Sequence, residues 1–129
     1  MKNVRILLFE DNRKDTNDIS EALGIAGCVV RSASNLADSL SLVKTHTEYA
    51  IPCDVLLVDA NLHTTGVRDG RCGRVIHQAA QDLVARGAKI MNISQDPSEK
   101  LGLPFHADPG KNPQKIVQAV RAALFPVDN

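Results

Sequence analysis

Three short apolar runs constrain the fold of this chain more than any other feature. They span residues 2–9, 53–58 and 88–93. Each has the length of a strand and lacks the regular polar–apolar alternation of a strand with one face in water. Strands of this kind are buried on both faces, as in a parallel sheet covered by helices on its two sides. We therefore expect an α/β fold built around a parallel sheet.

Each apolar run ends at a side chain that carries a carboxylate or a hydroxyl. Glu10 and Asp11 follow the first run, and Asp59 follows the second. Ser94 follows the third. Because the carboxyl ends of parallel strands meet at one edge of a sheet, these side chains should converge there. Three crowded carboxylates repel one another, so a hard divalent cation with oxygen ligands is the expected counter-charge.

The segments between and after these runs complete a strand–helix pattern that is repeated five times. The further predicted elements are a helix at 14–26, a strand at 28–33, a helix from a cap at Ser34 or Asn35 to Thr47, a helix at 73–86, one or two helical turns at 97–101, a short strand at 103–107 weakened by Pro104, and a closing helix after Asn112-Pro113. We expect a single domain over residues 1–129. Its predicted fold is a doubly wound (βα)5 flavodoxin-like three-layer sandwich with a five-stranded parallel sheet.

Composition and charge disfavour several functional classes. The formal net charge is zero and apolar residues make up 43% of the chain, so bulk electrostatics indicates neither direct nucleic acid binding nor membrane binding. No segment is long and apolar enough to be a membrane span. The three cysteines, Cys28, Cys53 and Cys72, form no CxxC motif. We interpret them as reduced thiols and expect a cytoplasmic protein.

With these elements in place, the chain resembles a response-regulator receiver domain (CheY-like), the phosphoacceptor module of two-component signalling. The resemblance covers essentially the whole chain. Five features in the right order carry it: the acidic pair Glu10-Asp11 after Phe9, Asp59 after the run 54–58, Leu62 three residues later, Ser94 at the end of the fourth strand, and Lys111 before the last helix.

The resemblance implies a magnesium site at the acidic residues. Asp11 and Asp59 would ligate Mg²⁺ directly, and the backbone carbonyl of Asn61 would be a third protein ligand. Glu10 would act through metal-bound water, because Mg²⁺ keeps several of its waters in proteins.

The resemblance also implies that the chain is a signalling domain rather than an enzyme. Asp59 would accept a phosphoryl group from a sensor histidine kinase or a phosphotransfer protein. Lys111 would place a positive charge on a phosphoryl oxygen, and the hydroxyl of Ser94 would contact another. The only chemistry would be self-catalysed phosphoryl transfer and autodephosphorylation, and the product would switch protein–protein interactions. The downstream target is not indicated.

Departures from the family pattern concern the loops rather than the acids. His63 stands four residues after Asp59, where the family usually has proline. The glycine that usually follows shortly afterwards is found in Asp69-Gly70, about three residues later than usual, so the loop is longer. Asn112 separates Lys111 from Pro113, so a cis peptide after the lysine is not assured.

Two further departures lie between Ser94 and Lys111. This stretch is short, which predicts a shortened fourth helix. Asp108 occupies the position of the usual switch aromatic, and Phe105 is out of register with it. Asn61 and Asp96 fall at positions that vary among receivers and affect hydrolysis of the phosphoaspartate.

Two alternatives stay open. The first is a degenerate receiver-like module that binds proteins without phosphorylation, which the atypical fourth helix and missing aromatic favour. The second is a flavodoxin-like enzyme with a nucleotide or flavin. A phosphate-binding loop after the first strand would be rich in glycine, serine or threonine, whereas this chain has Glu10-Asp11-Asn12, which disfavours that alternative.

Overall fold

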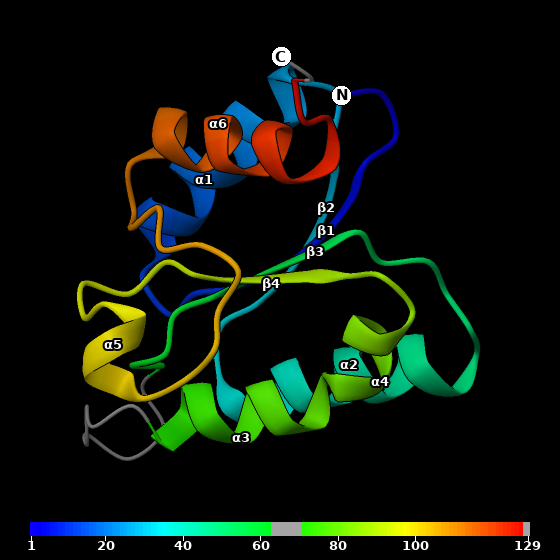
Figure 1. The fold of residues 1–129 in the computed structure, drawn as a ribbon, viewed down its shortest axis with the longest axis vertical. Helices are drawn as coiled ribbons and strands as arrows, with labels where there is room; N and C mark the ends of the chain where they lie inside the picture. The colour runs from blue at the N-terminus through cyan, green and yellow to red at the C-terminus, as the bar shows by residue number, and fades with distance from the viewer. Residues whose placement is uncertain (63–70, 128–129) are drawn as a thin grey trace.

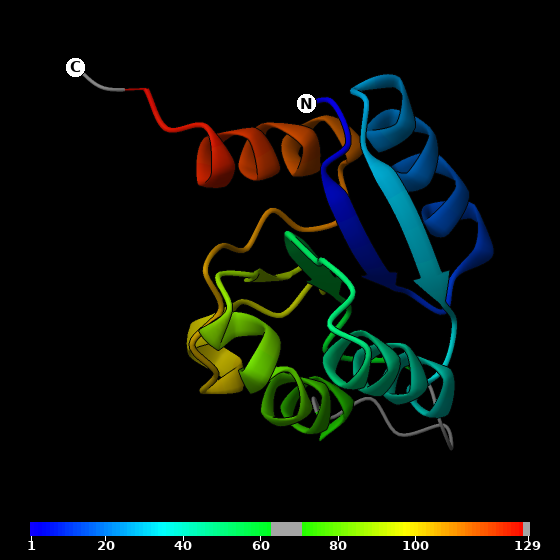
Figure 2. The same cartoon turned by 90° about the vertical axis from the view of Figure 1, so that its right-hand side faces the viewer.

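The structure is a computed structural model, and it describes residues 1–62 and 71–127. Its centre is a parallel sheet with the strand order β2-β1-β3-β4. The two strands at one side of the sheet, β2 and β1, lie side by side in Figure 2. The bounds of the strands are Arg5–Phe9 (β1), Val29–Ala33 (β2), Val55–Val58 (β3) and Lys89–Asn92 (β4).

Helices cover both faces of this sheet (Figure 1). In the figure α1 and α6 lie together on one side, and α2, α3 and α4 lie on the other. The short helix α5 follows β4. The bounds of the helices are Arg13–Ile25 (α1), Leu36–Glu48 (α2), Arg71–Ala79 (α3), Gln81–Ala85 (α4), Ser98–Leu101 (α5) and Pro113–Leu124 (α6).

Asparagine side chains cap the three longest helices. Asn12 precedes α1, Asn35 precedes α2 and Asn112 precedes α6. Each side chain accepts a hydrogen bond from the backbone N–H three residues later, at 2.8–3.1 Å. Such a cap stabilises a helix by about 1 kcal/mol, because it satisfies an N–H that has no partner inside the helix. The caps also fix where the loops at the carboxyl ends of β1 and β2 stop.

Most residues of the strands are apolar, and these side chains pack into two separate cores, one on each face of the sheet. Along β1, Ile6 and Leu8 pack into the core beneath α1 and α6. Leu7 and Phe9 point to the other face, into the core shared with α2 and α3. All four are buried, as expected for a strand that is covered on both sides.

The predicted fifth strand is wrong for the described residues, which contain four strands. Only an isolated parallel bridge between Met91 and Ala107 marks its place. Two ladder bonds form there: the His106 N–H donates to the Ile90 carbonyl, and the Asn92 N–H donates to the Ala107 carbonyl. Pro104 lacks an N–H, so the ladder cannot extend toward the start of this segment.

Two helix predictions have different outcomes. The single helix predicted at 73–86 is two helices, α3 and α4, which break at Ala80. The shortened helix predicted between the fourth strand and Lys111 is confirmed, because α5 has four residues and ends at Gly102 in the left-handed region, with φ 67°.

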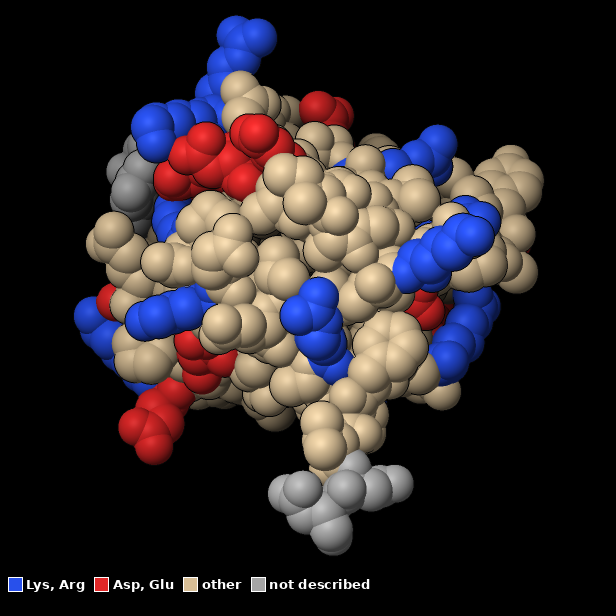
Figure 3. Space-filling model, turned by 90° about the horizontal axis from the view of Figure 1, so that it is seen from above, with Lys and Arg blue, Asp and Glu red and all other residues tan. Residues whose placement is uncertain are grey.

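The helices and the charged side chains of the surface bear on the expected absence of a membrane span. None of the helices in the described ranges combines the length and the apolar character needed to cross a bilayer. Figure 3 shows lysine and arginine side chains in separate groups with acidic residues between them. This distribution agrees with the formal net charge of zero.

Candidate functional site

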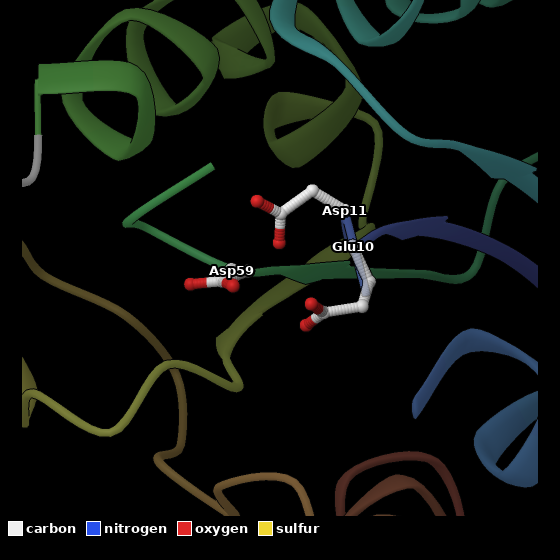
Figure 4. Close-up of side chains that lie close together, drawn as sticks. All are labelled: Glu10, Asp11 and Asp59. Carbon is white, nitrogen blue, oxygen red and sulfur yellow. The ribbon is translucent and has the colours of Figure 1, made fainter. Parts of the chain in front are cut away.

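The three predicted acids converge at the carboxyl ends of β1 and β3. Glu10, Asp11 and Asp59 each place a carboxylate oxygen so that all three atoms lie within 4.8 Å of one another. Figure 4 shows the three carboxylates turned toward a common space. Glu10 and Asp59 are buried, and Asp11 is half-buried. The prediction that these three acids lie together at one edge of the sheet is therefore confirmed.

Backbone pairing explains why the acids meet. Phe9 of β1 lies in register with Val58 of β3, so the residues that follow them are neighbours. The Asp59 N–H donates to the Phe9 carbonyl at 2.9 Å, and the Glu10 N–H donates to the Ala33 carbonyl at 3.1 Å. The ladder thus continues one residue beyond β1 and β3, and it positions the backbone that carries the acids.

A glycine in α3 lets the loop after Asp59 pack closely. The Gly73 N–H donates to the Ala60 carbonyl at 3.1 Å. A Cβ atom at Gly73 would lie 2.6 Å from the Ala60 Cβ and 2.7 Å from its Cα. No side chain fits there without moving the backbone next to Asp59.

Lys111 reaches into the acid cluster from the loop before α6. Its Nζ lies 3.2 Å from Glu10 Oε1 and Oε2, 3.2 Å from Asp59 Oδ2 and 3.7 Å from Asp15 Oδ2. Burial lowers the pKa of Lys111, but the charges of Asp59 and Glu10 outweigh this effect, and the net pKa is raised. Lys111 is therefore a built-in counter-charge in this structure, a pairing that the sequence did not predict.

The site leaves one carboxylate poorly satisfied. The pKa of Glu10 is raised from 4.5 to about 7, mainly because its carboxyl is buried. The hydrogen bond from the Asn12 N–H lowers this pKa, and the charge of Asp59 raises it. Glu10 Oε2 accepts no hydrogen bond of good geometry, although Lys111 Nζ lies 3.2 Å away. A buried oxygen in this state, beside two more carboxylates, fits a hard divalent cation such as Mg²⁺, which prefers oxygen ligands.

Asn61 links the acceptor loop to the loop after β4. Its N–H donates to Asp59 Oδ1 at 2.9 Å, and its side-chain amide donates to Asp96 Oδ2 at 2.9 Å. Lys100 donates to the other oxygen of Asp96 at 2.9 Å, and these two contacts, that of Lys100 first, lower the pKa of Asp96. The role of the Asn61 backbone carbonyl as a metal ligand stays a prediction.

The hydroxyl of Ser94 is engaged away from the acids. Ser94 is buried, and its Oγ lies 2.7 Å from Asn92 Oδ1 and 2.9 Å from the Asp96 carbonyl, either of which can accept its proton. No hydrogen bond joins it to Asp59 among the described residues, so the predicted contact with a phosphoryl oxygen would need this hydroxyl to rotate.

Asp108 completes a polar network that the sequence analysis missed. Its Oδ1 accepts hydrogen bonds from the side-chain amide of Asn92 at 2.9 Å and from the backbone N–H and the hydroxyl of Ser98. Phe105 packs edge-on against His77, with ring centroids 5.4 Å apart, in the core beneath α3. One signal was available, because Asn92 interrupts an apolar strand and a buried amide needs partners.

Two other predicted departures have simple outcomes. All peptide bonds among the described residues are trans, including the one before Pro113. His63 and Asp69-Gly70 lie outside the described residues.

A broad cavity opens beside the acids toward the β2 side of the sheet. Its volume is about 690 Å³, and Glu10 and Asp11 line it, whereas Asp59 does not. The remaining lining is largely polar and comes from the start of α1, the end of β2 and α2: Arg13, Thr16, Ser32, Ala33, Ser34, Asp38, Ser41 and Leu42. Glu10 and Asp11 of the acid cluster thus border open space on this side.

Comparison with known proteins shows the fold. No protein-family profile and no curated protein matches the sequence. A response regulator receiver protein from Sinorhizobium medicae is 20% identical, with a TM-score of 0.73 over 96% of each chain. The chemotaxis response regulator CheY4 of Vibrio cholerae is 17% identical, with a TM-score of 0.73 over 95% of this chain and all of that one.

A third similar structure carries an occupied site. It is a response regulator protein from Burkholderia pseudomallei with a phosphorylated aspartic acid, a calcium ion and citrate, 19% identical, with a TM-score of 0.67 over 94% of this chain and 69% of that one. This chain therefore has the fold of response-regulator receiver domains over most of its length, with a carboxylate cluster at the carboxyl ends of its strands.

Proposed function

We propose that this chain is a phosphoacceptor receiver that takes a phosphoryl group on Asp59 with the help of Mg²⁺. One observation carries the proposal: Glu10, Asp11 and Asp59 gather their carboxylates within 4.8 Å, and Lys111 contacts the buried acceptor candidate. The receiver fold supports it. The calcium ion and phosphorylated aspartic acid in the Burkholderia structure show that a protein of this fold can hold both groups.

The geometry suggests how each side chain would act. The Asn61 N–H holds Asp59 Oδ1 at 2.9 Å, which fixes the orientation of the carboxylate. A carboxylate oxygen of Asp59 would attack the phosphorus of a phosphohistidine, so that a P–O bond forms and the P–N bond breaks, leaving the imidazole to take up a proton. Lys111, 3.2 Å from Asp59 Oδ2, would move its charge toward the incoming phosphoryl oxygens.

Mg²⁺, when held at this acid cluster, would neutralise charge between the carboxylates and the phosphoryl group. Asp11 and Asp59 would be direct ligands, and the Asn61 backbone carbonyl a third. Glu10 would hold a metal-bound water. The unsatisfied Glu10 Oε2 supports this assignment, because it needs a donor or a cation.

The proposed donor is a sensor histidine kinase or a phosphotransfer protein, and the proposed output is a switched protein–protein interaction in the cytoplasm. In this proposal the chain turns over no separate substrate. The output surface would differ from that of typical receivers, because α5 is a single turn and Asp108 stands in the switch-aromatic position.

One observation favours a second candidate, a protein-binding module that works without phosphorylation. The Ser94 hydroxyl is already held by Asn92 and Asp96. If these bonds persisted, Ser94 would not respond to a phosphoryl group on Asp59.

Intact-mass spectrometry with acetyl phosphate separates the two candidates. We expect one phosphoryl adduct on the wild type in Mg²⁺, and no adduct with EDTA or on Asp59→Asn. Asp18→Asn, the same change at a partly exposed aspartate of α1, is the control and should be modified like the wild type. A folded wild type that gains no adduct from acetyl phosphate or from a phosphohistidine protein donor would favour the phosphorylation-independent module.

A further inference from the structure

A second cavity lies at the opposite end of the sheet from the acid cluster. It has a volume of about 260 Å³ and is formed where β1 and β2 begin, beside the end of α2 and the segment before β3. Its walls combine apolar and basic side chains: Arg5, Ile6, Leu7, Val29, Arg31, His46, Ile51, Pro52 and Cys53. It shares no lining residue with the cavity at the acids.

Two arginines on neighbouring strands face this cavity from one side of the sheet. Arg5 is in register with Val29, and Leu7 is in register with Arg31. Arg5 and Arg31 are therefore diagonal neighbours, and strand alternation puts both on the face that α2 covers, the face of Leu7. Their guanidinium groups make no ion pair or hydrogen bond with any described residue. Both arginines are exposed, and like charges on neighbouring positions of a sheet disfavour each other, so an anion bound between them would be stabilised.

A buried histidine supplies an independent sign of a ligand. His46 is 3% exposed and lines the cavity. Its Nδ1 lies 2.8 Å from the Leu42 carbonyl, so Nδ1 carries a proton, while Nε2 has no partner among the described residues. The side chain is thus almost entirely buried, yet one of its ring nitrogens is left to the cavity without a protein partner.

The cavity contains no negative charge of its own. Burial is the main cause that raises the pKa of Cys53 to about 12, with Asp54 adding to it, so the thiol is neutral. Its Sγ–H donates to the Val55 carbonyl. The nearby carboxylate of Asp54 does not line the cavity, and it accepts a hydrogen bond from the Arg5 backbone N–H at 2.8 Å. An incoming anion would thus meet two guanidinium groups and no competing acid in the lining.

We propose that this cavity binds a small monocarboxylic acid with an apolar body. The guanidinium groups of Arg5 and Arg31 would hold the carboxylate at the mouth of the cavity that His46 lines. The apolar body would pack against Val29, Ile51 and Pro52, from which it excludes water. A volume of about 260 Å³ lies below the range of drug-sized ligand pockets, so the ligand is a small acid of about the size of phenylacetate. The site uses neither Asp59 nor the metal cluster.

The test is an NMR titration of ¹⁵N-labelled protein with phenylacetate and with its neutral analogue phenylacetamide. We expect saturable shifts from phenylacetate in the amides around Arg5, Arg31 and His46, and affinity for the amide lower by about tenfold or more, since charge-assisted hydrogen bonds are lost. Asp59→Asn should bind phenylacetate like the wild type, which keeps this test separate from the proposed phosphorylation.

Arg31→Met is the informative variant, because Arg31 is exposed and its loss does not threaten the fold. It should weaken phenylacetate binding by about tenfold. Lys115→Met removes the same charge from an exposed position on α6 and should leave the affinity unchanged. Equal affinities for acid and amide, unchanged binding by Arg31→Met, or shifts outside this cavity would each overturn the proposal.

Discussion

The burial of the Glu10 carboxyl makes the stability of the metal-free protein depend on pH in a specific way. In the folded protein the pKa of Glu10 is raised from 4.5 to about 7, chiefly by burial. Between these two values the unfolded chain has lost the Glu10 proton while the folded chain keeps it. The folded state therefore binds more protons, and the free energy of unfolding must fall as pH rises through this window.

The size of the effect follows from the shift. A shift from 4.5 to about 7 corresponds to about 3 kcal/mol of stability, most of which is lost between pH 5 and pH 8. Glu10→Gln removes the titrating group and keeps the shape of the side chain. The variant should thus gain stability relative to the wild type as pH rises, by about 2–3 kcal/mol over this range in EDTA.

Urea unfolding followed by far-UV circular dichroism measures this difference, since the chain has no tryptophan to report by fluorescence. The informative quantity is the stability of Glu10→Gln minus that of the wild type at each pH, because most other titrations cancel in it. Glu21→Gln makes the same change at an exposed position of α1 and should differ little from the wild type. A Glu10→Gln difference that stays constant from pH 5 to pH 8 would refute the reasoning.

Three further predictions concern the same region. Gly73→Ala should destabilise the protein by about 1–3 kcal/mol in urea unfolding, because its Cβ meets the backbone of Ala60, whereas Gly24→Ala, with open space around it, should change stability by less than about 1 kcal/mol. Lys111→Met should slow Asp59 phosphorylation by acetyl phosphate, measured by intact mass, and should lower the melting temperature in EDTA at pH 8, because it leaves two buried carboxylates without their cation. If the metal binds with a Kd of about 1 mM, about 10 mM Mg²⁺ should stabilise the wild type by about 1.4 kcal/mol, seen as a higher melting temperature; an unchanged melting temperature would argue against the metal site.

The acid cluster could be predicted because it depends on strand order alone. Glu10 and Asp59 each follow an apolar run, and any parallel sheet with these runs as neighbours brings their ends together. The start of the last helix could also be predicted, since Asn112 followed by proline is a local signal for the beginning of a helix.

The features that escaped prediction depend on contacts between distant segments. The ion pairs of Lys111 span 52 residues to Asp59 and 101 residues to Glu10. The hydrogen bond from Asn92 to Asp108 depends on how the segment after α5 returns to β4. The prediction of a fifth strand was wrong for a local reason. Pro104 has no backbone N–H to donate to a neighbouring strand, and the segment forms only a single bridge.

The most direct measurement is to locate the phosphoryl group on the chain. The protein is treated with acetyl phosphate and Mg²⁺ and then with borohydride, which reduces an acyl phosphate to the alcohol and so converts a phosphoaspartate to homoserine. Peptide mass mapping then identifies the reduced residue. The account predicts homoserine at Asp59 alone, and none when Mg²⁺ is replaced by EDTA. Reduction at Glu10 or Asp11 instead, or an unreduced Asp59 in folded protein, would contradict it.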